Sequence, residues 1–251
     1  MRTCVFVGVD LAWSTKARTG LAAVDGSGAL VDSASLRTDD DIDRWLGRGE
    51  WAPVVVGVDA PLIVVNGAGQ RSCERMVSQQ FGAFGASCHT ANRGRSWFDP
   101  PRGATLAERH GWDMDPARPG TVERPACIEV YPHPAMVALF GLDRVIPYKG
   151  KSGRSVEFRR AAFADLVRHI EAREPLALGS SARWADIRET ADRATRQVDL
   201  DRLEDEIDAI LCAHLAWLWH HERDSMTVYG DLATGYIVTP PPPARPSRSR
   251  T

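Results

Sequence analysis

The sequence of 251 residues contains no apolar stretch that approaches the roughly 20 residues needed to cross a lipid bilayer. Its start, Met1-Arg2-Thr3, runs directly into an apolar segment, without the features of a secretory signal. The five cysteines are few, widely spaced and odd in number, which favours reduced thiols over a disulfide framework. We therefore expect a cytoplasmic protein that does not enter a membrane.

An excess of positive charge is also missing. The formal net charge is −2 at pH 7, whereas proteins that bind nucleic acid usually carry a basic face. Any basic surface must therefore be local. What the chain does have is 43% hydrophobic residues, which is ordinary for a globular protein with a full core.

Two runs rich in β-branched residues, 5–9 and 54–58, each stop at an aspartate, Asp10 and Asp59. Both runs are apolar on both faces, which predicts central strands of a sheet with helices on either side. Ligands of such sheets bind beyond the strand ends, so both carboxylates are expected where chemistry usually occurs.

The remaining pattern predicts a mixed α/β protein. The turn at residues 25–28 predicts a hairpin, so the first three strands are expected to form an antiparallel meander. Thr38 and the three aspartates after it predict a helix start before the fourth strand. A fifth strand is expected at residues 126–131, with a helix starting at Pro132.

Further boundaries follow from composition. Residues 62–126 have no sustained period and predict a loop-rich insert with a short helix near 72–80. A helix is expected at 156–173, and residues 176–197 are expected to be helical in part. We expect one domain, residues 1–239, and a disordered tail rich in proline and arginine, residues 240–251.

A late helix, expected at about residues 200–222, carries a second acidic pair. Asp205 and Asp208 are three residues apart and share one face of this helix. Ionised carboxylates at that spacing repel each other on a buried helix unless a cation lies between them. The alternative is that Asp205 is a first-turn acid that faces water.

The same helix is expected to be largely buried. Ala209, Ala213 and Ala216 form a smooth second face, on which another backbone could approach closely.

Short motifs along nearly the whole chain, to about Pro240, resemble one known family. They are Gly8-Val9-Asp10-Leu11-Ala12-Trp13, Asp59-Ala60-Pro61-Leu62, Cys73-Glu74-Arg75, Glu129-Val130-Tyr131-Pro132-His133-Pro134, Asp205-Glu206-Ile207-Asp208-Ala209, and Gly230-Asp231 with Gly235-Tyr236-Ile237-Val238. In these motifs the chain resembles domain-of-unknown-function family 429 (DUF429), predicted nucleases of RNase H-like fold.

The resemblance implies a five-stranded RNase H-like mixed sheet with helices on both faces. Asp10 would end its first strand, Asp59 its fourth, and an acidic helix would close the site, as in RuvC-like resolvases. The spacing of Asp205 and Asp208 is similar to the resolvase pattern. Glu129 departs from it, because the minimal nuclease cage does not require this additional acid.

Four carboxylates from three elements suit two Mg²⁺ or Mn²⁺ ions, which are hard cations that prefer oxygen ligands. We therefore expect a metal-dependent nuclease that hydrolyses phosphodiester bonds of DNA or RNA by a two-metal mechanism. The expected catalytic residues are Asp10, Asp59, Glu129, Asp205 and Asp208, and the expected metal ligands are the four aspartates.

Basic side chains are candidates to bind the substrate phosphate. They are Arg71, Arg75, Lys149, Lys151, Arg159 and Arg160. His133, between two prolines, could transfer a proton or bind metal at this site, or could be a structural hydrogen-bonding residue.

Two other functions remain open. The fold could be a non-catalytic module that binds nucleic acid or protein, in which the acids serve folding alone. An actin-like phosphotransferase shares the early strand order and an aspartate after the first strand. It also needs a glycine-rich phosphate loop and a second related domain, and the chain is too short for that duplication.

Overall fold

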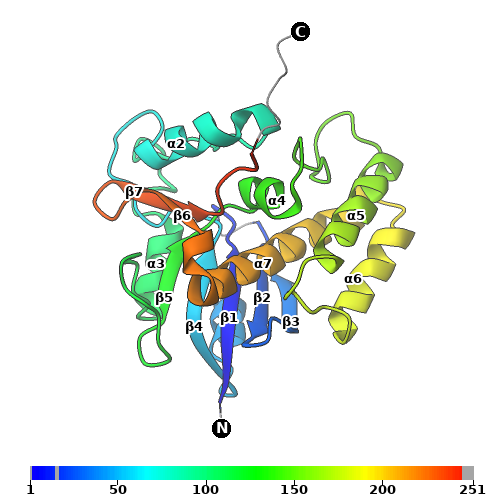
Figure 1. Ribbon diagram of the computed structural model, residues 1–251, viewed down its shortest axis with the longest axis horizontal. Helices are drawn as coiled ribbons and strands as arrows, with labels where there is room; N and C mark the ends of the chain where they lie inside the picture. The colour runs from blue at the N-terminus through cyan, green and yellow to red at the C-terminus, as the bar shows by residue number, and fades with distance from the viewer. Residues whose placement is uncertain (1, 15–16, 245–251) are drawn as a thin grey trace.

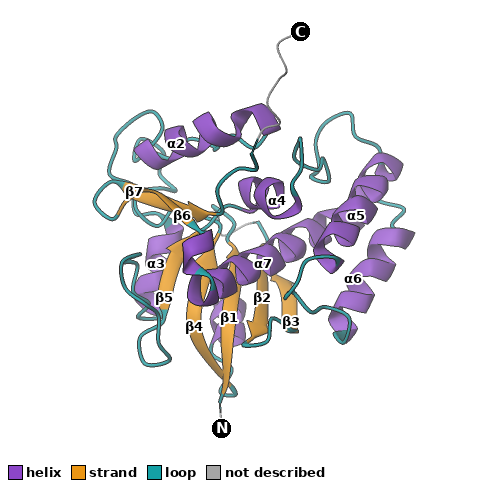
Figure 2. Ribbon diagram, viewed as in Figure 1, coloured by secondary structure: helices purple, strands orange, loops and turns teal. Residues whose placement is uncertain are grey.

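A mixed five-stranded sheet forms the centre of the computed structural model, which describes residues 2–14 and 17–244 (Figures 1 and 2). Its strands are β1 Thr3–Asp10, β2 Thr19–Asp25, β3 Leu30–Leu36, β4 Trp51–Val58 and β5 Ala126–Glu129. The order is β3-β2-β1-β4-β5, in which β1 to β3 are antiparallel and β1, β4 and β5 are parallel. This arrangement confirms the predicted meander and is consistent with an RNase H-like fold.

Seven helices surround this sheet in the described part of the chain. They are α1 Asp39–Leu46, α2 Ser72–Phe81, α3 Arg102–Arg109, α4 Pro132–Phe140, α5 Val156–Glu171, α6 Ala182–Arg193 and α7 Gln197–His221. The longest, α7, crosses one face of the sheet in front of β4, β1 and β2, and α5 and α6 pack beside it (Figure 1). Val5, Val7 and Val9 point to the opposite face and are also completely buried, so both faces are covered.

Glycines in the sheet allow α7 to lie directly on it. A Cβ atom at Gly8 would be 1.9 Å from the carbonyl oxygen of Ala209 and 2.2 Å from the amide nitrogen of Ala213. At Gly20 it would be 1.8 Å from the carbonyl oxygen of Asp205. The smooth alanine face of the predicted helix therefore contacts the backbone of the sheet, as expected.

Helix α1 begins where the sequence predicts. The hydroxyl of Thr38 accepts a hydrogen bond from the amide of Asp41 at 3.1 Å, which satisfies a free amide of the first turn. Three apolar side chains of this helix, Ile42, Trp45 and Leu46, join the main core.

The segment 62–126 contains more structure than expected. The predicted short helix is present as α2, but α3 was not predicted, because Gly103 and three charged residues obscure the helical spacing of its apolar residues. Three ion pairs attach α3 to α1. Arg102 pairs with Asp39, and Arg109 pairs with Asp43 at 2.6 Å and with Asp39 at 3.7 Å.

A two-stranded sheet, β6 Thr227–Asp231 and β7 Gly235–Thr239, packs against α2 and was not predicted as strands either (Figure 1). Most of the expected disordered tail, residues 245–251, lies outside the described residues.

All five cysteines are free thiols, as predicted, with Cys4 exposed and the other four buried or half-buried. Within residues 2–14 and 17–244, no helix combines the length and the apolar character required to cross a membrane.

Candidate carboxylate site

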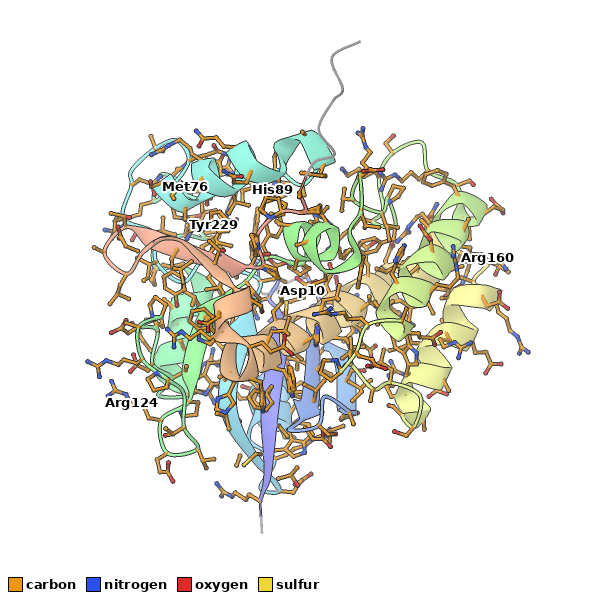
Figure 3. All side chains as sticks on the ribbon, in the orientation of Figure 1. Asp10, Met76, His89, Arg124, Arg160 and Tyr229 are labelled. Atoms are coloured by element: carbon orange, nitrogen blue, oxygen red, sulfur yellow. The ribbon has the colours of Figure 1, made fainter. Side chains whose placement is uncertain are left out.

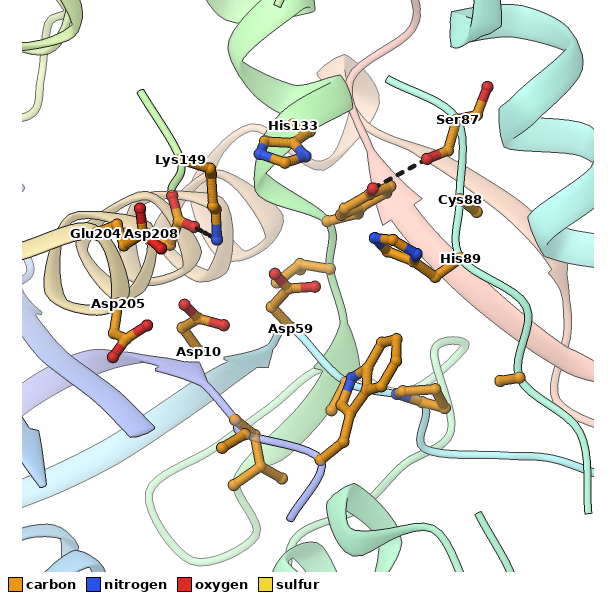
Figure 4. A pocket seen from close by; sticks show the side chains of 18 of the residues that line it. Asp10, Asp59, Ser87, Cys88, His89, His133, Lys149, Glu204, Asp205 and Asp208 are labelled. Carbon is orange, nitrogen blue, oxygen red and sulfur yellow. Dashed lines mark hydrogen bonds and ion pairs between the residues drawn. The ribbon is translucent and has the colours of Figure 1, made fainter. Parts of the chain in front are cut away.

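Asp10 and Asp59 lie side by side at the ends of two neighbouring parallel strands (Figure 4). Val9 pairs with Val58, and the amide of Asp59 donates a hydrogen bond of 2.8 Å to the carbonyl of Val9. Asp10 follows Gly8 by two residues and therefore points to the face that α7 covers.

The side chain of Asp59 also points to the face that α7 covers, because side chains alternate between the two faces along β4. Gly57, two residues earlier, pairs with Gly8 and lies under the carbonyl of Cys212 in α7.

Helix α7 places Asp205 and Asp208 above these two strand ends. The carbonyl of Asp205 lies on Gly20, whose Cα is the partner of Asp10 in the neighbouring strand. Asp208 is completely buried. Because α7 begins at Gln197 rather than Leu200, Asp205 belongs to its third turn, so the first-turn alternative is wrong. The structure thus brings together the four aspartates expected to bind metal.

A lysine enters this cluster from the loop after α4. The ammonium of Lys149 forms an ion pair with Asp208 (Figure 4). The hydroxyl of Tyr148 donates a hydrogen bond to the same carboxylate. Burial lowers the pKa of Lys149, but attraction to Asp208 and Asp10 outweighs burial and raises this pKa well above its usual value. Lys149 is therefore a permanent cation among the carboxylates.

One lysine does not neutralise the cluster. Burial raises the pKa of Asp10 well above its usual value, and repulsion from Asp208, Asp59 and Asp205 adds to this effect against the attraction of Lys149. Burial likewise raises the pKa of Asp59 and of Asp205 to about 7 each. Ionisation of these groups leaves excess negative charge, which a further cation would compensate.

The donor atoms suit a hard divalent ion, although the site is not preassembled. No three histidine, cysteine, aspartate or glutamate side chains of the described chain have the arrangement of a metal site. The carboxylate oxygens of the four aspartates are the ligands that Mg²⁺ and Mn²⁺ prefer. These aspartates would hold the ions, and the ammonium of Lys149 would have to leave Asp208.

Glu129, also predicted to be catalytic, lines the same cavity as the aspartates, and its charge contributes to the raised pKa of Asp59, but it lies on a different face of the sheet. It pairs in register with Val58 rather than with Asp59, so its side chain points to the other face of the sheet. There its carboxylate accepts hydrogen bonds of 2.5 and 2.8 Å from Arg71 and one of 3.0 Å from the amide of Leu62.

Arg71 and Arg159 are likewise not available to a phosphate, which corrects their predicted role. Arg71 is 3% exposed and lies between Glu129 and Glu74. Its buried ion pairs join α2 to the end of β5.

Arg159 is 1% exposed and forms ion pairs of 2.7 Å with Asp201 and 2.8 Å with Glu204. Its role is to join α5 to α7. Arg160 lies at the periphery of the molecule, away from Asp10 (Figure 3).

Arg75 is exposed, but it donates a hydrogen bond of 2.6 Å to the carbonyl of Gln70 and does not line the cavity beside the carboxylates.

A cavity of about 940 Å³ opens beside the carboxylates. Its wall includes four basic residues in addition to Lys149 and Arg71, and these are Arg18, Arg144, Lys151 and Arg154. Only Lys151 was predicted from the sequence. Within the described residues, Arg144 and Lys151 have no acidic partner within ion-pair distance, so both charges are available to a ligand.

The wall opposite the aspartates is aromatic. Trp13, His89, Trp97 and Phe98 line it, and Figure 4 shows His89 across the site from Asp205 and Asp208. Trp13 belongs to one of the short motifs quoted above, and the other three lie in residues 62–126, for which the sequence predicts only a loop-rich insert with one short helix. The available signal was the unusual presence of tryptophan in a polar, glycine-rich segment.

His133 also lines the cavity, between Tyr131 and Tyr148 at ring-centroid distances of 5.6 and 6.0 Å. Burial lowers its pKa to about 4, so it is neutral at pH 7. A charged contact between His133 and phosphate is therefore not expected at neutral pH.

Comparison with known proteins adds one finding. The family model described as "Protein of unknown function (DUF429)" matches residues 8–233. No curated protein and no solved structure matches the chain. The matched segment contains strands β2 to β5, the end of β1 from Gly8, all seven helices, and all four clustered aspartates. By this match the chain belongs to the DUF429 family.

Proposed function

We propose that the protein is a metal-dependent nuclease that hydrolyses phosphodiester bonds. The observation that carries this proposal is the convergence of Asp10, Asp59, Asp205 and Asp208 from two strands and one helix beside an open cavity. Structural acids are normally paired one to one, whereas here Lys149 faces several carboxylates at once. A site with such excess negative charge is suited to divalent cations.

Bound Mg²⁺ or Mn²⁺ ions would supply Lewis-acid activation of water and stabilisation of the leaving oxygen. The chain itself supplies ligands on a rigid backbone. Asp10 and Asp59 are held by strand ends, and α7 holds the other two aspartates on the glycines beneath it.

The phosphate backbone would be bound by the basic residues of the cavity wall, above all Lys151 and Arg144. This local basic surface accommodates an anionic polymer despite the net charge of −2.

One observation favours the alternative of a non-catalytic binding module. Lys149 already compensates the buried charge of Asp208 without any metal. If this ion pair is permanent, the acids would serve folding and the cavity would only bind.

Cleavage assays separate the two functions. Wild type and Asp10→Asn would be incubated with labelled single-stranded, duplex and branched DNA and RNA in Mn²⁺, Mg²⁺ or EDTA. We expect cleavage that requires metal and falls at least about 100-fold in Asp10→Asn, because the variant loses charge stabilisation at the reacting centre.

The matched control is Asp192→Asn, whose side chain is 84% exposed on α6. It should cleave as wild type does. Cleavage that survives in Asp10→Asn, or metal-independent binding without cleavage of any substrate, would contradict the nuclease proposal.

A further inference from the structure

Two tryptophans of the cavity wall keep much of their surface exposed. Trp13 is 37% exposed and Trp97 is 46% exposed, although large aromatic side chains usually bury most of their area. Both lean on Phe98, which is 2% exposed, at ring-centroid distances of 5.3 and 6.2 Å. Phe98 is thus a buried support beneath two exposed indole rings.

The neighbours of Trp13 do not stack flat on it. Phe98 meets its ring plane at 64°, and His89 meets it at 83° with a centroid distance of 5.6 Å. Among the described residues, no aromatic ring lies parallel to the Trp13 indole within contact distance. A planar ligand could therefore stack on this ring.

The position of Trp13 relative to the carboxylates is held by hydrogen bonds of the preceding residue. The amide of Ala12 donates to the hydroxyl of Thr19 at 3.3 Å, and its carbonyl accepts a bond of 2.6 Å from Arg102. Trp13 is three positions after Asp10, so their Cα atoms are at most about 11 Å apart. This length corresponds to roughly three stacked nucleotides at about 3.4 Å each.

We propose that Trp13 stacks on an unpaired nucleobase of the substrate, so that the cavity selects single-stranded nucleic acid. This inference rests on the nuclease function proposed above. The cavity offers an aromatic face for the base, Lys151 and Arg144 for phosphates, and the aspartates for metal at the cleaved bond. In a blunt duplex the base faces are covered by neighbouring pairs, so only unpaired or extruded bases can occupy this site.

An abasic-site scan tests the proposal. Fluorescence anisotropy would measure binding of labelled eight-nucleotide strands of DNA and RNA in Ca²⁺, with strand integrity checked on gels. A second set would carry one abasic site at each position in turn, and a blunt DNA duplex would complete the panel. The proteins are wild type, Trp13→Ala, Trp13→Phe and the control Phe158→Ala, which truncates an aromatic side chain 48% exposed outside the cavity.

We expect Trp13→Ala to bind intact strands about 5- to 100-fold more weakly, which is the range for loss of one base–aromatic stack. The same substitution should have less than about a twofold effect on strands whose abasic site falls at the stacking position, because the partner base is already missing. Trp13→Phe should recover most of the affinity, Phe158→Ala should bind like wild type, and wild type should prefer both single strands to the duplex.

Equal losses on intact and abasic strands, or no loss at all, would overturn the stacking proposal. Parallel cleavage assays in Mn²⁺ separate this failure from failure of the nuclease proposal. Cleavage of duplex and single strands alike, unaffected by Trp13→Ala, would leave the nuclease and remove the base site. Binding that depends on Trp13, without cleavage of any substrate, would support the base site and overturn the nuclease proposal. Absence of both Trp13-dependent binding and cleavage would overturn the two proposals together. Thermal melts of Trp13→Ala should match wild type, since the ring lies outside the core.

Discussion

Gly8 of β1 lies directly against the backbone carbonyl of Ala209 in α7. A Cβ atom at Gly8 would be 1.9 Å from that carbonyl oxygen, far closer than van der Waals contact allows. The positions of Asp205 and Asp208 above the strand ends therefore depend on the absence of a side chain at Gly8.

Gly8→Ala should consequently lift α7 from the sheet. We expect the free energy of unfolding to fall by about 1 to 4 kcal/mol, as in overpacked cores, and the stabilisation by Mn²⁺ to weaken. Urea unfolding with and without Mn²⁺ measures both effects. Gly49→Ala, where nothing lies within 4 Å of the added methyl, is the control and should behave as wild type. Equal stability of the two variants would show that α7 does not rest on Gly8 as described.

Asp59→Asn should stabilise the metal-free protein at alkaline pH. Burial raises the pKa of Asp59 from 3.8 to about 7, so the carboxyl is protonated in both folded and unfolded protein below pH 3.8. Above that pH folding carries a cost that grows until about pH 7 and then stays constant. Asparagine never carries the charge, so the free energy of unfolding should rise by roughly 1 to 3 kcal/mol at pH 8 and stay unchanged near pH 4.

Urea unfolding of Asp59→Asn and wild type between pH 4 and pH 8 checks this dependence, with exposed Asp192→Asn as the control. A gain that is the same at every pH would argue against a destabilising charge at Asp59.

Lys149→Met should make the protein more dependent on metal. The substitution leaves Asp208 and its neighbours without their cation, so we expect a loss of roughly 2 to 4 kcal/mol in EDTA at pH 8. Mn²⁺ should then raise the melting temperature more than it does for wild type, because the ion no longer competes with the ammonium. Lys151→Met, which removes an exposed charge without an acidic partner in the described chain, should change neither value. A variant as stable as wild type and indifferent to Mn²⁺ would contradict this account of the cluster.

Arg71→Met should unfold more easily without losing the metal response. The substitution leaves two buried carboxylates, Glu74 and Glu129, without their cation. The free energy of unfolding should therefore fall by about 3 to 5 kcal/mol. The double variant Arg71→Met/Glu129→Gln should recover part of this loss, while exposed Arg75→Met should cost less than about 0.5 kcal/mol. Thermal melts with and without Mn²⁺ measure these values. A stable Arg71→Met protein with weakened oligonucleotide binding would instead restore Arg71 to the phosphate site.

The convergence of the aspartates could be predicted because it depends on local periodicity. A run of β-branched residues ends at Asp10 and another at Asp59, and helical spacing places Asp205 and Asp208 on one face. Each of these features is determined by residues close in sequence.

The roles of Glu129 and the arginines could not be predicted in the same way. Whether Glu129 faces the cluster depends on which residue of β4 it pairs with, and a shift of one residue reverses the answer. The burial of Arg71 and Arg159 depends on acids 58 and 45 residues away that meet them only in the folded protein. Prediction of the aromatic wall would have required the path of residues 62–126, because only the folded insert brings His89 and Phe98 to Trp13.

The close contact between the backbone of α7 and the glycines of the sheet restricts which parts of the site can move when a metal ion binds. A helix whose backbone touches the sheet cannot slide or rotate, so the backbone positions of the four aspartates are fixed and loading an ion requires only side-chain movements. The adjustment falls to Lys149, whose four methylene groups allow its ammonium to swing out of the cluster while the backbone stays in place. The backbone that carries the aspartates is thus stationary, and the side chain of Lys149 has to move for an ion to bind Asp208.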